Sequence, residues 1–368
     1  HNTIQSCELT DLGAGGIQIE RYDQSPWADG SEFKTAQNTV KDCLIAHGGR
    51  ILPAGAGIVI GQSDSNFIDH NEICDLYWTG VSCGWFYDSG AHYNTITNNR
   101  IHHIGQGVLS DMGGVYTLAP QVGTVIRGNI IHDVGRRTYG GWGIYLDEYS
   151  AYITAEKNWV YNVQDGGFHI HYGSANNIKN NVFAFSQNGQ LYRTRAEDQL
   201  QFNFLRNICY WQNTPWSSRS KTLVGDWSGD GYWFDWNVYF DAGGKPVTFA
   251  GLTFDQWRAK GQDTNSVIGD PLFVSPEEYD FRLLPGSIAP SLGFVNFDPR
   301  GAGRFNQQSE ASLARPAFPV QFVEPIPFLA ACSVNSGLLM TTDRAGVIAE
   351  FDRPRVKSRA LRCPPRRV

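Results

Sequence analysis

Acidic and histidine side chains gather in three Gly-rich segments near the middle of the chain. Asp111 stands in SerAspMetGlyGly, the pair Asp147 and Glu148 ends GlyIleTyrLeuAspGlu, and His169 and His171 alternate in GlyPheHisIleHis. Cleavage of a glycosidic bond requires two carboxyl groups beside one groove. One protonates the leaving oxygen, and the other attacks the sugar carbon or activates water. We therefore interpret Asp111 and Asp147 as the candidate catalytic pair.

A repeated pattern predicts the elements that position these residues. An apolar residue is followed three places later by Asn, or by Cys in the first two instances, at intervals of roughly 23 to 36 residues, which is the spacing of a solenoid. The pairs are Ile4/Cys7, Val40/Cys43, Ile68/Asn71, Ile96/Asn99, Ile126/Asn129, Ala155/Asn158, Ile178/Asn181, Phe204/Asn207 and Phe234/Asn237. Asn suits a tight turn because it tolerates left-handed backbone geometry, and its amide can bond the Asn of the neighbouring coil. We expect Cys7 and Cys43 to be stacked, buried thiols rather than a bridge.

Alternating residues after each turn predict short strands. Aligning the coils gives an inward column (Val81, Val115, Ile144, Phe168, Leu191), an outward column (Ser82, Tyr116, Tyr145, His169, Tyr192) and, two places on, a further outward column (Gly84, Leu118, Asp147, His171, Thr194). Neighbouring rungs lie about 4.8 Å apart, so Asp147 should lie near His171, and Tyr145 over His169. The predicted fold is an all-β, single-stranded parallel β-helix with an Asn ladder, right-handed by the chirality of β-crossovers.

Two adjacent coils are longer than the others. The segments that follow Asn99 and Asn129 carry insertions around Asp111 and Tyr139. Insertions on neighbouring rungs build walls beside one patch of surface, and repeat proteins commonly place binding sites there. We therefore expect Asp111 to lie on the inserted edge, next to the rung of Asp147.

Other polar and aromatic residues on this face are predicted to bind substrate. They are Glu148, Tyr116, Tyr145, His169, His171, Arg193, Arg195 and Trp142. Each has a structural alternative. Asp111 could bond only turn amides, the acids at 147 and 148 could be merely solvated, the two Arg could only neutralise the acids, and Trp142, like Trp78 and Trp85, could anchor a loop.

Composition excludes several classes of partner. The net charge is −6 and the pI is near 5.8, so no basic stripe favours nucleic acid. No stretch has the length of a membrane span. His169 and His171 lack a third metal ligand, so we expect no metal and no cofactor. We expect a monomer whose partner is an oligo- or polysaccharide.

The chain divides into a long repeat region and a tail. Residues 1–300 are predicted to form the β-helix catalytic domain, and the start at His1 inside a repeat indicates that N-terminal coils are missing. Residues 22–36 and 212–231 should be loops. A short helix is expected around 253–258, and strands at 270–274 and 280–283 should close the solenoid. Residues 301–368, which end in a basic, Pro-bearing stretch, should be an extended or disordered tail.

The central motifs resemble those of a known group of enzymes. AspMetGlyGlyValTyrThr (111–117), TyrGlyGlyTrpGlyIleTyrLeuAspGlu (139–148), GlyGlyPheHisIleHisTyrGly (166–173) and LeuTyrArgThrArg (191–195) are similar to segments of secreted bacterial right-handed β-helix glycosidases. The resemblance is to glycoside hydrolase family 141, which includes α-L-fucosidases and xylanases. It implies a pectate-lyase-like solenoid, secretion or a periplasmic location, and an active-site Asp pair at Asp111 and Asp147.

Three functions compete at this point. The leading hypothesis is a glycoside hydrolase that acts on a plant or microbial polysaccharide. A polysaccharide lyase would need Ca²⁺ on an Asp cluster and a Lys or Arg base, for which only Arg193 and Arg195 are at hand. The third is a non-catalytic, carbohydrate-binding β-helix protein.

Overall fold

A computed structural model of the chain describes residues 1–20, 35–87, 91–213, 220–305, 339–342 and 348–351. The chain divides into two units, His1–Val323 and Glu324–Val368. In the second unit, β32 (Leu339–Thr342) and β33 (Ile348–Phe351) pair as an antiparallel hairpin. The tail expected at 301–368 is described only in part, so its extent stays a prediction.

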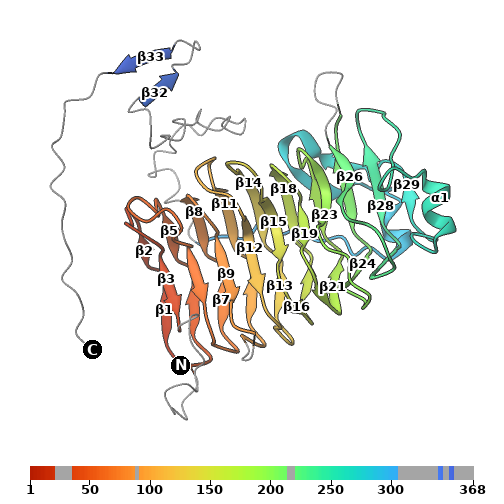
Figure 1. The fold of residues 1–368 in the computed structure, drawn as a ribbon. Coiled ribbons are helices and arrows are strands. Elements are labelled where there is room, and N and C mark those ends of the chain that lie inside the picture. The colour runs from red at the N-terminus through yellow and green to blue at the C-terminus, as the bar shows by residue number, and fades with distance from the viewer. Residues whose placement is uncertain (21–34, 88–90, 214–219, 306–338, 343–347, 352–368) are drawn as a thin grey trace, which may run out of the picture. The chain divides into compact units, whose positions relative to one another are not determined.

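Three stacked parallel sheets make up the first unit (Figure 1). Sheet A contains β1 (Thr3–Gln5), β4 (Thr39–Lys41), β7 (Phe67–Asp69), β10 (Thr95–Thr97), β13 (Val125–Arg127), β17 (Thr154–Glu156), β21 (Asn176–Lys179), β24 (Phe202–Leu205) and β27 (Tyr232–Asp235). Sheet B contains β2 (Glu8–Leu9), β5 (Leu44–Ala46), β8 (Glu72–Leu76), β11 (Arg100–Ile104), β14 (Ile130–Val134), β18 (Trp159–Val163), β22 (Val182–Ala184), β25 (Ile208–Trp211), β28 (Val238–Asp241) and β29 (Val267–Ile268). Sheet C contains β3 (Ile17–Ile19), β6 (Ile58–Ile60), β9 (Val81–Gly84), β12 (Met112–Leu118), β15 (Gly141–Leu146), β19 (Phe168–Ile170), β23 (Gly189–Arg193) and β26 (Lys221–Gly225).

Each coil up to that of β26 gives one strand to each sheet, the later coils give fewer, and each strand pairs with its counterpart in the next coil. The nine apolar residues of the repeat are register partners along sheet A, from Ile4 opposite Val40 to Phe204 opposite Phe234. Their side chains fill one continuous apolar core inside the coils. The predicted all-β parallel β-helix is therefore confirmed. A short pair, β16 (Ser150–Ala151) and β20 (Gly173–Ser174), adds to the turns.

The Asn ladder forms as predicted, but with a different backbone. The backbone N–H and Nδ2 of Asn71 donate to Oδ1 of Asn99 at 3.0 and 2.9 Å, and Nδ2 also donates to the carbonyl of Val40. Left-handed geometry falls on the preceding residue instead, for example His70 (φ 52) and Asn98 (φ 51). The expectation that the ladder Asn adopts it was wrong. The amide must point into the coil to reach the carbonyl, and so the turn is made one residue earlier.

Two further details of the N-terminal coils differ from expectation. A second Asn ladder, which the repeat pattern did not predict, joins Asn38, Asn66 and Asn94, each of which directly precedes a strand of sheet A. Cys43 is buried and bonds Asn71 through its backbone N–H, but Cys7 is exposed, so the two are not a pair of stacked buried thiols.

The end of the solenoid is covered by α1 (Phe254–Ala259), the helix predicted around 253–258. Thr253 begins it with a reciprocal capping box to Gln256. The fully buried Trp257 stacks on Phe249 and Tyr232 at 5.5 and 5.6 Å between ring centroids. A membrane-crossing helix is absent from the described residues.

Strands β30 (Phe273–Ser275) and β31 (Asp280–Leu283) form near the predicted positions but do not close the end. They pair as an antiparallel hairpin whose Phe273 and Phe281 pack on the outer face of sheet B, against Trp159, Tyr161 and Tyr210. The hairpin turns at η1 (Pro276–Glu278), and η2 (Ala289–Leu292) follows it. The outer face of sheet B is aromatic here, which explains why it needs a cover. The loop expected at 212–231 was also wrong in part, because β26 lies within it; the loop expected at 22–36 lies almost wholly outside the described residues.

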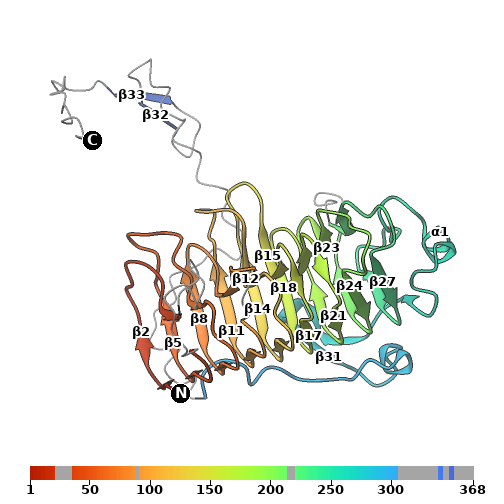
Figure 2. The ribbon, with the colours of Figure 1, turned by 60° about the horizontal axis from the view of Figure 1, so that its bottom comes forward.

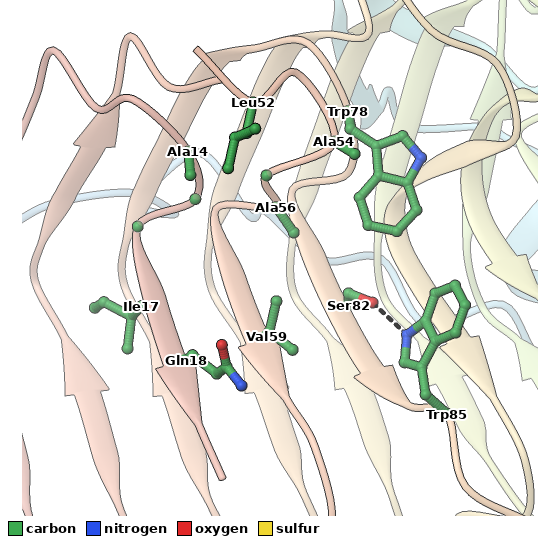
Figure 3. Close-up of a pocket in the computed structure, with 13 residues that line it drawn as sticks. Ala14, Ile17, Gln18, Leu52, Ala54, Ala56, Val59, Trp78, Ser82 and Trp85 are labelled. Atoms are coloured by element: carbon green, nitrogen blue, oxygen red, sulfur yellow. Dashed lines mark hydrogen bonds between the residues drawn. The ribbon is translucent and has the colours of Figure 1, made fainter. Parts of the chain in front are cut away.

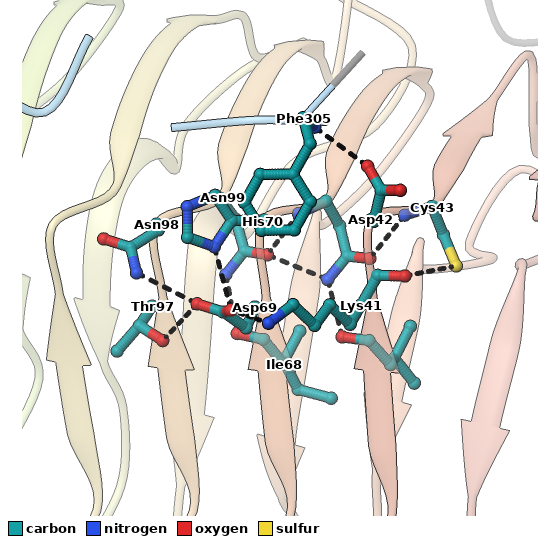
Figure 4. A network of polar contacts seen from close by, with 12 residues as sticks. Lys41, Asp42, Cys43, Ile68, Asp69, His70, Thr97, Asn98, Asn99 and Phe305 are labelled. Atoms are coloured by element: carbon teal, nitrogen blue, oxygen red, sulfur yellow. Dashed lines mark hydrogen bonds and ion pairs between the residues drawn. The ribbon is translucent and has the colours of Figure 1, made fainter. Parts of the chain in front are cut away.

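After the hairpin, the chain runs back along the coils to the N-terminal end (Figure 2). The backbone N–H of Val295 donates to the side-chain oxygen of Asn180, and that of Gly303 donates to the carbonyl of Asn98. Phe305 then stacks on His70 at 4.3 Å, and its N–H donates to Asp42 (Figure 4). We call residues 273–305 the strap.

Candidate active site

A cavity of about 470 Å³ opens on the outer face of sheet C, over β12, β15, β19 and β23. The predicted outward column is confirmed, because Tyr116, Tyr145, His169 and Tyr192 are register partners on consecutive strands. The cavity is lined by Asp111, Arg136, Thr138, Tyr139, Gly140, Trp142, Tyr145, Asp147, Glu148, Asp165, His169, His171, Tyr192 and Thr194.

Asp111 is placed by the two insertions. It directly precedes β12 with left-handed backbone geometry (φ 61), and its N–H donates to the carbonyl of Tyr139 in the other insertion. Gly140 also has positive φ (80), and a Cβ there would lie 2.7 Å from the Asp111 backbone. The indole of Trp78 donates to the Asp111 carbonyl at 2.9 Å. Two inserted loops and one Trp therefore hold this residue at the cavity edge.

Asp147 follows β15 and faces the same cavity. It is 7% exposed, and the hydroxyl of Tyr116 donates to its Oδ2 at 2.5 Å. The hydroxyl of Tyr145 donates to Oδ1 of Asp111 at 3.3 Å. Two stacked tyrosines, Tyr116 and Tyr145, thus each bond one of the two carboxyl groups, which the sequence predicted to be neighbours.

The electrostatics of the pair favour a proton on Asp111. Burial raises the pKa of its carboxyl, and the negative charge of Asp147 raises it further. Hydrogen bonds from Tyr145 and Tyr139 and the charge of His171 oppose this without reversing it. Burial and the two carboxylates also raise the pKa of Tyr116 and Tyr145, which therefore stay neutral donors.

Aromatic rings form the floor beside the acids. Trp142, Tyr145 and His169 pack against one another, and the ring of His169 lies 3.9 and 4.6 Å from those of Trp142 and Tyr145, between centroids. Burial holds the pKa of His169 well below its usual range, so the ring is neutral. Its Nε2 and the Nδ1 of the more exposed His171 both contact the hydroxyl of Thr194, at 3.0 and 2.7 Å. These hydrogen bonds fix both rings.

Three predicted substrate-binding residues do not line the cavity. Tyr116 is 2% exposed and lies behind Asp147, which it supports. Arg193 lies in the inward column with Leu191, and its guanidinium donates inside the coil to Gln201 and to carbonyls of the 226–228 loop. Arg195 turns to Glu197 and Tyr172 at the rim of the coil. The structure therefore does not bring Arg193 and Arg195 to the cavity, and Tyr116 contacts it through Asp147.

Glu148 lies at the edge of the cavity, where the hydroxyl of Tyr87 donates to it at 2.7 Å. This bond raises the pKa of Tyr87 to about 12. Tyr87 belongs to an earlier coil, so its hydrogen bond to Glu148 links two coils at the edge of the cavity.

Sequence reasoning missed a third carboxylate. Asp165 is buried, accepts the backbone N–H groups of Gly140 and Gly141, and pairs with Arg136 at 2.6 Å. Its signal was present, because Asp165 stands directly before the GlyGly of its coil. Since its oxygens are bound by these groups and by Asn188, Asp165 supports the inserted loop rather than offering a free carboxylate.

A possible metal-binding cluster lies elsewhere among the described residues. Ligand atoms of His103, on β11, and of His132 and Asp133, on β14, lie within 4.8 Å of one another on sheet B. None of the three lines the acidic cavity. The expectation of no metal remains a prediction.

Comparison with known proteins identifies the class that this fold defines. The family model described as "Right handed beta helix region" matches residues 1–204, more than half of the chain, so the protein belongs to this family. No curated protein matches it. A solved structure titled "Glycoside hydrolase" is similar, with 22% identity and a TM-score of 0.38, over 48% of this chain and 30% of that one. The match therefore spans less than a third of that protein.

Proposed function

We propose that this protein is a glycoside hydrolase that cleaves a plant or microbial polysaccharide in the cavity on sheet C. The single observation that carries the proposal is the pairing of Asp111 and Asp147 in one cavity, where each accepts a hydrogen bond from one of two stacked tyrosines. Retaining and inverting glycosidases alike use two carboxyl groups at the scissile bond.

The different surroundings of the two acids suggest their roles. Asp111, whose pKa is raised by burial and by the neighbouring charge, would protonate the leaving oxygen. Asp147, held by Tyr116, would serve as the carboxylate that attacks the sugar carbon or activates water. Tyr139, an exposed aromatic residue of the cavity lining, offers ring surface to a sugar, whose C–H faces stack on aromatic rings, while the buried rings of Trp142, Tyr145 and His169 form a packed floor.

The resemblance to family 141, with its fucosidase and xylanase members, supports testing those sugars first. A secreted, monomeric protein remains part of the proposal. A lyase is less well supported, because Arg193 and Arg195, its candidate bases, point away from the cavity.

The experiment is a screen with aryl fucosides, xylosides and arabinosides and with polysaccharides, followed by variants. Asp111→Asn and Asp147→Asn should each reduce kcat/KM by about 10²–10⁴-fold, the usual worth of a general acid or base. Asp255→Asn, at an exposed site on α1, is the matched control.

Three results would contradict the proposal. An unsaturated product detected by its absorbance would indicate a lyase. Glycan binding without turnover in the wild type would indicate a binding protein. Full activity in both Asp variants would remove the two acids from the mechanism.

A further inference from the structure

A second, larger cavity lies on the same face of sheet C. It measures about 700 Å³ and lies over β3, β6 and β9, whereas the acidic cavity lies over β12 to β23. Its lining comes from the turns and strands of three successive coils and includes Gln18, Leu52, Val59, Trp78, Ser82 and Trp85 (Figure 3).

The two cavities share one column of residues as their floor. Gln18 is the register partner of Val59, Val59 of Ser82, and Ser82 of Tyr116. The column continues through Tyr145 and His169 in the acidic cavity. Since parallel rungs lie about 4.8 Å apart, an extended ligand on this face would pass from one cavity to the other within a few rungs.

Trp78 and Trp85 form the wall between the cavities, and their positions are fixed. The indole of Trp85 donates to Ser82 at 2.7 Å, and that of Trp78 donates to the carbonyl of Asp111. Both rings also contact the ring of Tyr116, whose centroid lies 5.1 Å from that of Trp85 and 5.7 Å from that of Trp78. One wall of the second cavity is therefore made by Trp78, which bonds Asp111, and by Trp85, which packs on Tyr116, the residue that supports Asp147.

The chemistry of the second cavity differs from that of the first. None of its lining side chains carries a charge, and Gln18 and Ser82 are its polar side chains. Small residues keep the rim low. Gly15 and Gly55 are required by the packing of one coil on the next, since a Cβ on Gly55 would lie 2.2 Å from a backbone nitrogen. Leu52 stands 63% exposed beside them. Such an open, uncharged surface with fixed indole rings suits the apolar face of a neutral sugar.

We propose that this cavity binds further, uncharged sugar residues of the same glycan whose scissile bond lies between Asp111 and Asp147. The proposal rests on the proposed function, and it adds that the substrate is a chain rather than a single sugar. It also places the neutral part of that glycan over β3, β6 and β9, the N-terminal strands of sheet C.

The test is binding of neutral oligosaccharides of increasing length, xylo- and gluco-oligosaccharides among them, by isothermal titration calorimetry with the Asp147→Asn protein to prevent turnover. Val59→Trp and, independently, Gln18→Trp would fill the floor from two different strands. Each should weaken the long oligosaccharides by about tenfold, or about 1.4 kcal/mol, relative to the short ones.

Phe67→Trp, which adds the same ring at an exposed site on sheet A, is the matched control and should leave the ratio of long to short affinities unaltered. Thermal melting checks that each variant folds, and two filling variants keep the test valid if one does not.

The outcomes separate the two proposals. Affinity that does not rise with length, or that neither filling variant alters, overturns the second cavity as a sugar site even if hydrolysis is observed. Length-dependent binding that both variants weaken supports it even if no hydrolysis is found, in which case the proposed function alone fails. Tighter binding of acidic than of neutral oligosaccharides would contradict the assignment to an uncharged chain.

Discussion

At the scale of single residues, the two acids are held by two stacked tyrosines. The hydroxyl of Tyr145 donates to Asp111, and that of Tyr116 donates to Asp147 from behind. Because both tyrosines stay neutral, they can donate hydrogen bonds at any ordinary pH. The acids are therefore held by donors that do not compete for protons.

Tyr116→Phe tests this support. It removes the donor to Asp147 but keeps the ring that stacks on Tyr145 at 4.4 Å. We expect kcat to fall by about 10-fold or more, because a charge-assisted hydrogen bond contributes about 1.5–3 kcal/mol, with little change in KM. Steady-state kinetics on the best substrate of the screen gives both values. Tyr152→Phe, an exposed tyrosine, is the control. An unaltered kcat would show that Tyr116 only fills space.

The raised pKa of Asp111 has a consequence for stability. A carboxyl whose pKa is higher in the folded than in the unfolded state stabilises the fold fully below the unfolded pKa of about 3.8, and this contribution is lost as pH rises through the folded pKa. At neutral pH the ionised carboxylate of Asp111 therefore destabilises the folded state. Asp111→Asn should raise the melting temperature at pH 7 and lose that advantage near pH 3, as calorimetry at both pH values would show. A lower melting temperature at pH 7 would mean that the charge of Asp111 is stabilising.

The same shift predicts a pH dependence of catalysis. If Asp111 is the proton donor, kcat/KM should fall on the alkaline side as pH rises through its pKa. Removing the neighbouring charge with Asp147→Gln would lower that pKa. Titration of the Asp111 carboxyl by NMR, in the wild type and in this variant, measures the shift directly. If the pKa of Asp111 is the same in both proteins, the charge of Asp147 does not act on the Asp111 carboxyl.

At the scale of elements, the alternation of inward and outward residues was predictable, but it was not applied to every residue. The inward positions of Val115, Ile144 and Phe168 follow from a period of two, and so does the outward position of Tyr145. The same rule places Arg193 inward beside Leu191. The sequence analysis instead placed Arg193 among the substrate-binding residues, but in the structure it donates to Gln201 and to loop carbonyls within the coil.

Contacts between distant segments could not be read from the repeat. The position of Tyr139 against Asp111 depends on where two inserted loops meet, and no local pattern encodes that distance. The outer face of sheet B is aromatic at Trp159 and Tyr161, but nothing in the sequence said that Phe281 would cover it. Long-range packing of this kind is set by shape rather than by periodicity.

The ladder allows an element-scale prediction. Asn129 is fully buried, donates to Asn158 and Ile96, and accepts from Asn99. Asn129→Ala should lower the free energy of unfolding by about 2–4 kcal/mol, since several buried partners are left unsatisfied at about 1–3 kcal/mol each. Chemical denaturation measures it. Asn177→Ala, on the outer side of β21, is the matched control and should cost far less. Equal losses would contradict a special role of the ladder.

At the scale of the whole first unit, the strap changes how the solenoid should unfold. Coils in a solenoid contact only their neighbours, so stability is usually the sum of local terms. Here Val295 bonds Asn180 and Arg304 pairs with Glu8, so one segment joins coils that are far apart in the sequence. This link should make the coils between Glu8 and Asn180 unfold together.

Phe281→Ala tests whether the strap supports the coils. Phe281 is 1% exposed and lies against Trp159, Tyr161 and Phe273. Truncation should cost about 3–5 kcal/mol, as for other buried Phe residues. Hydrogen exchange should show earlier opening of β14, β18 and β22, on which the strap packs, than of β12 and β15. The acidic cavity lies on sheet C, so activity per folded molecule should persist below the melting transition. If β12 and β15 open together with sheet B, the strap acts on the whole coil, and the cavity depends on it as well.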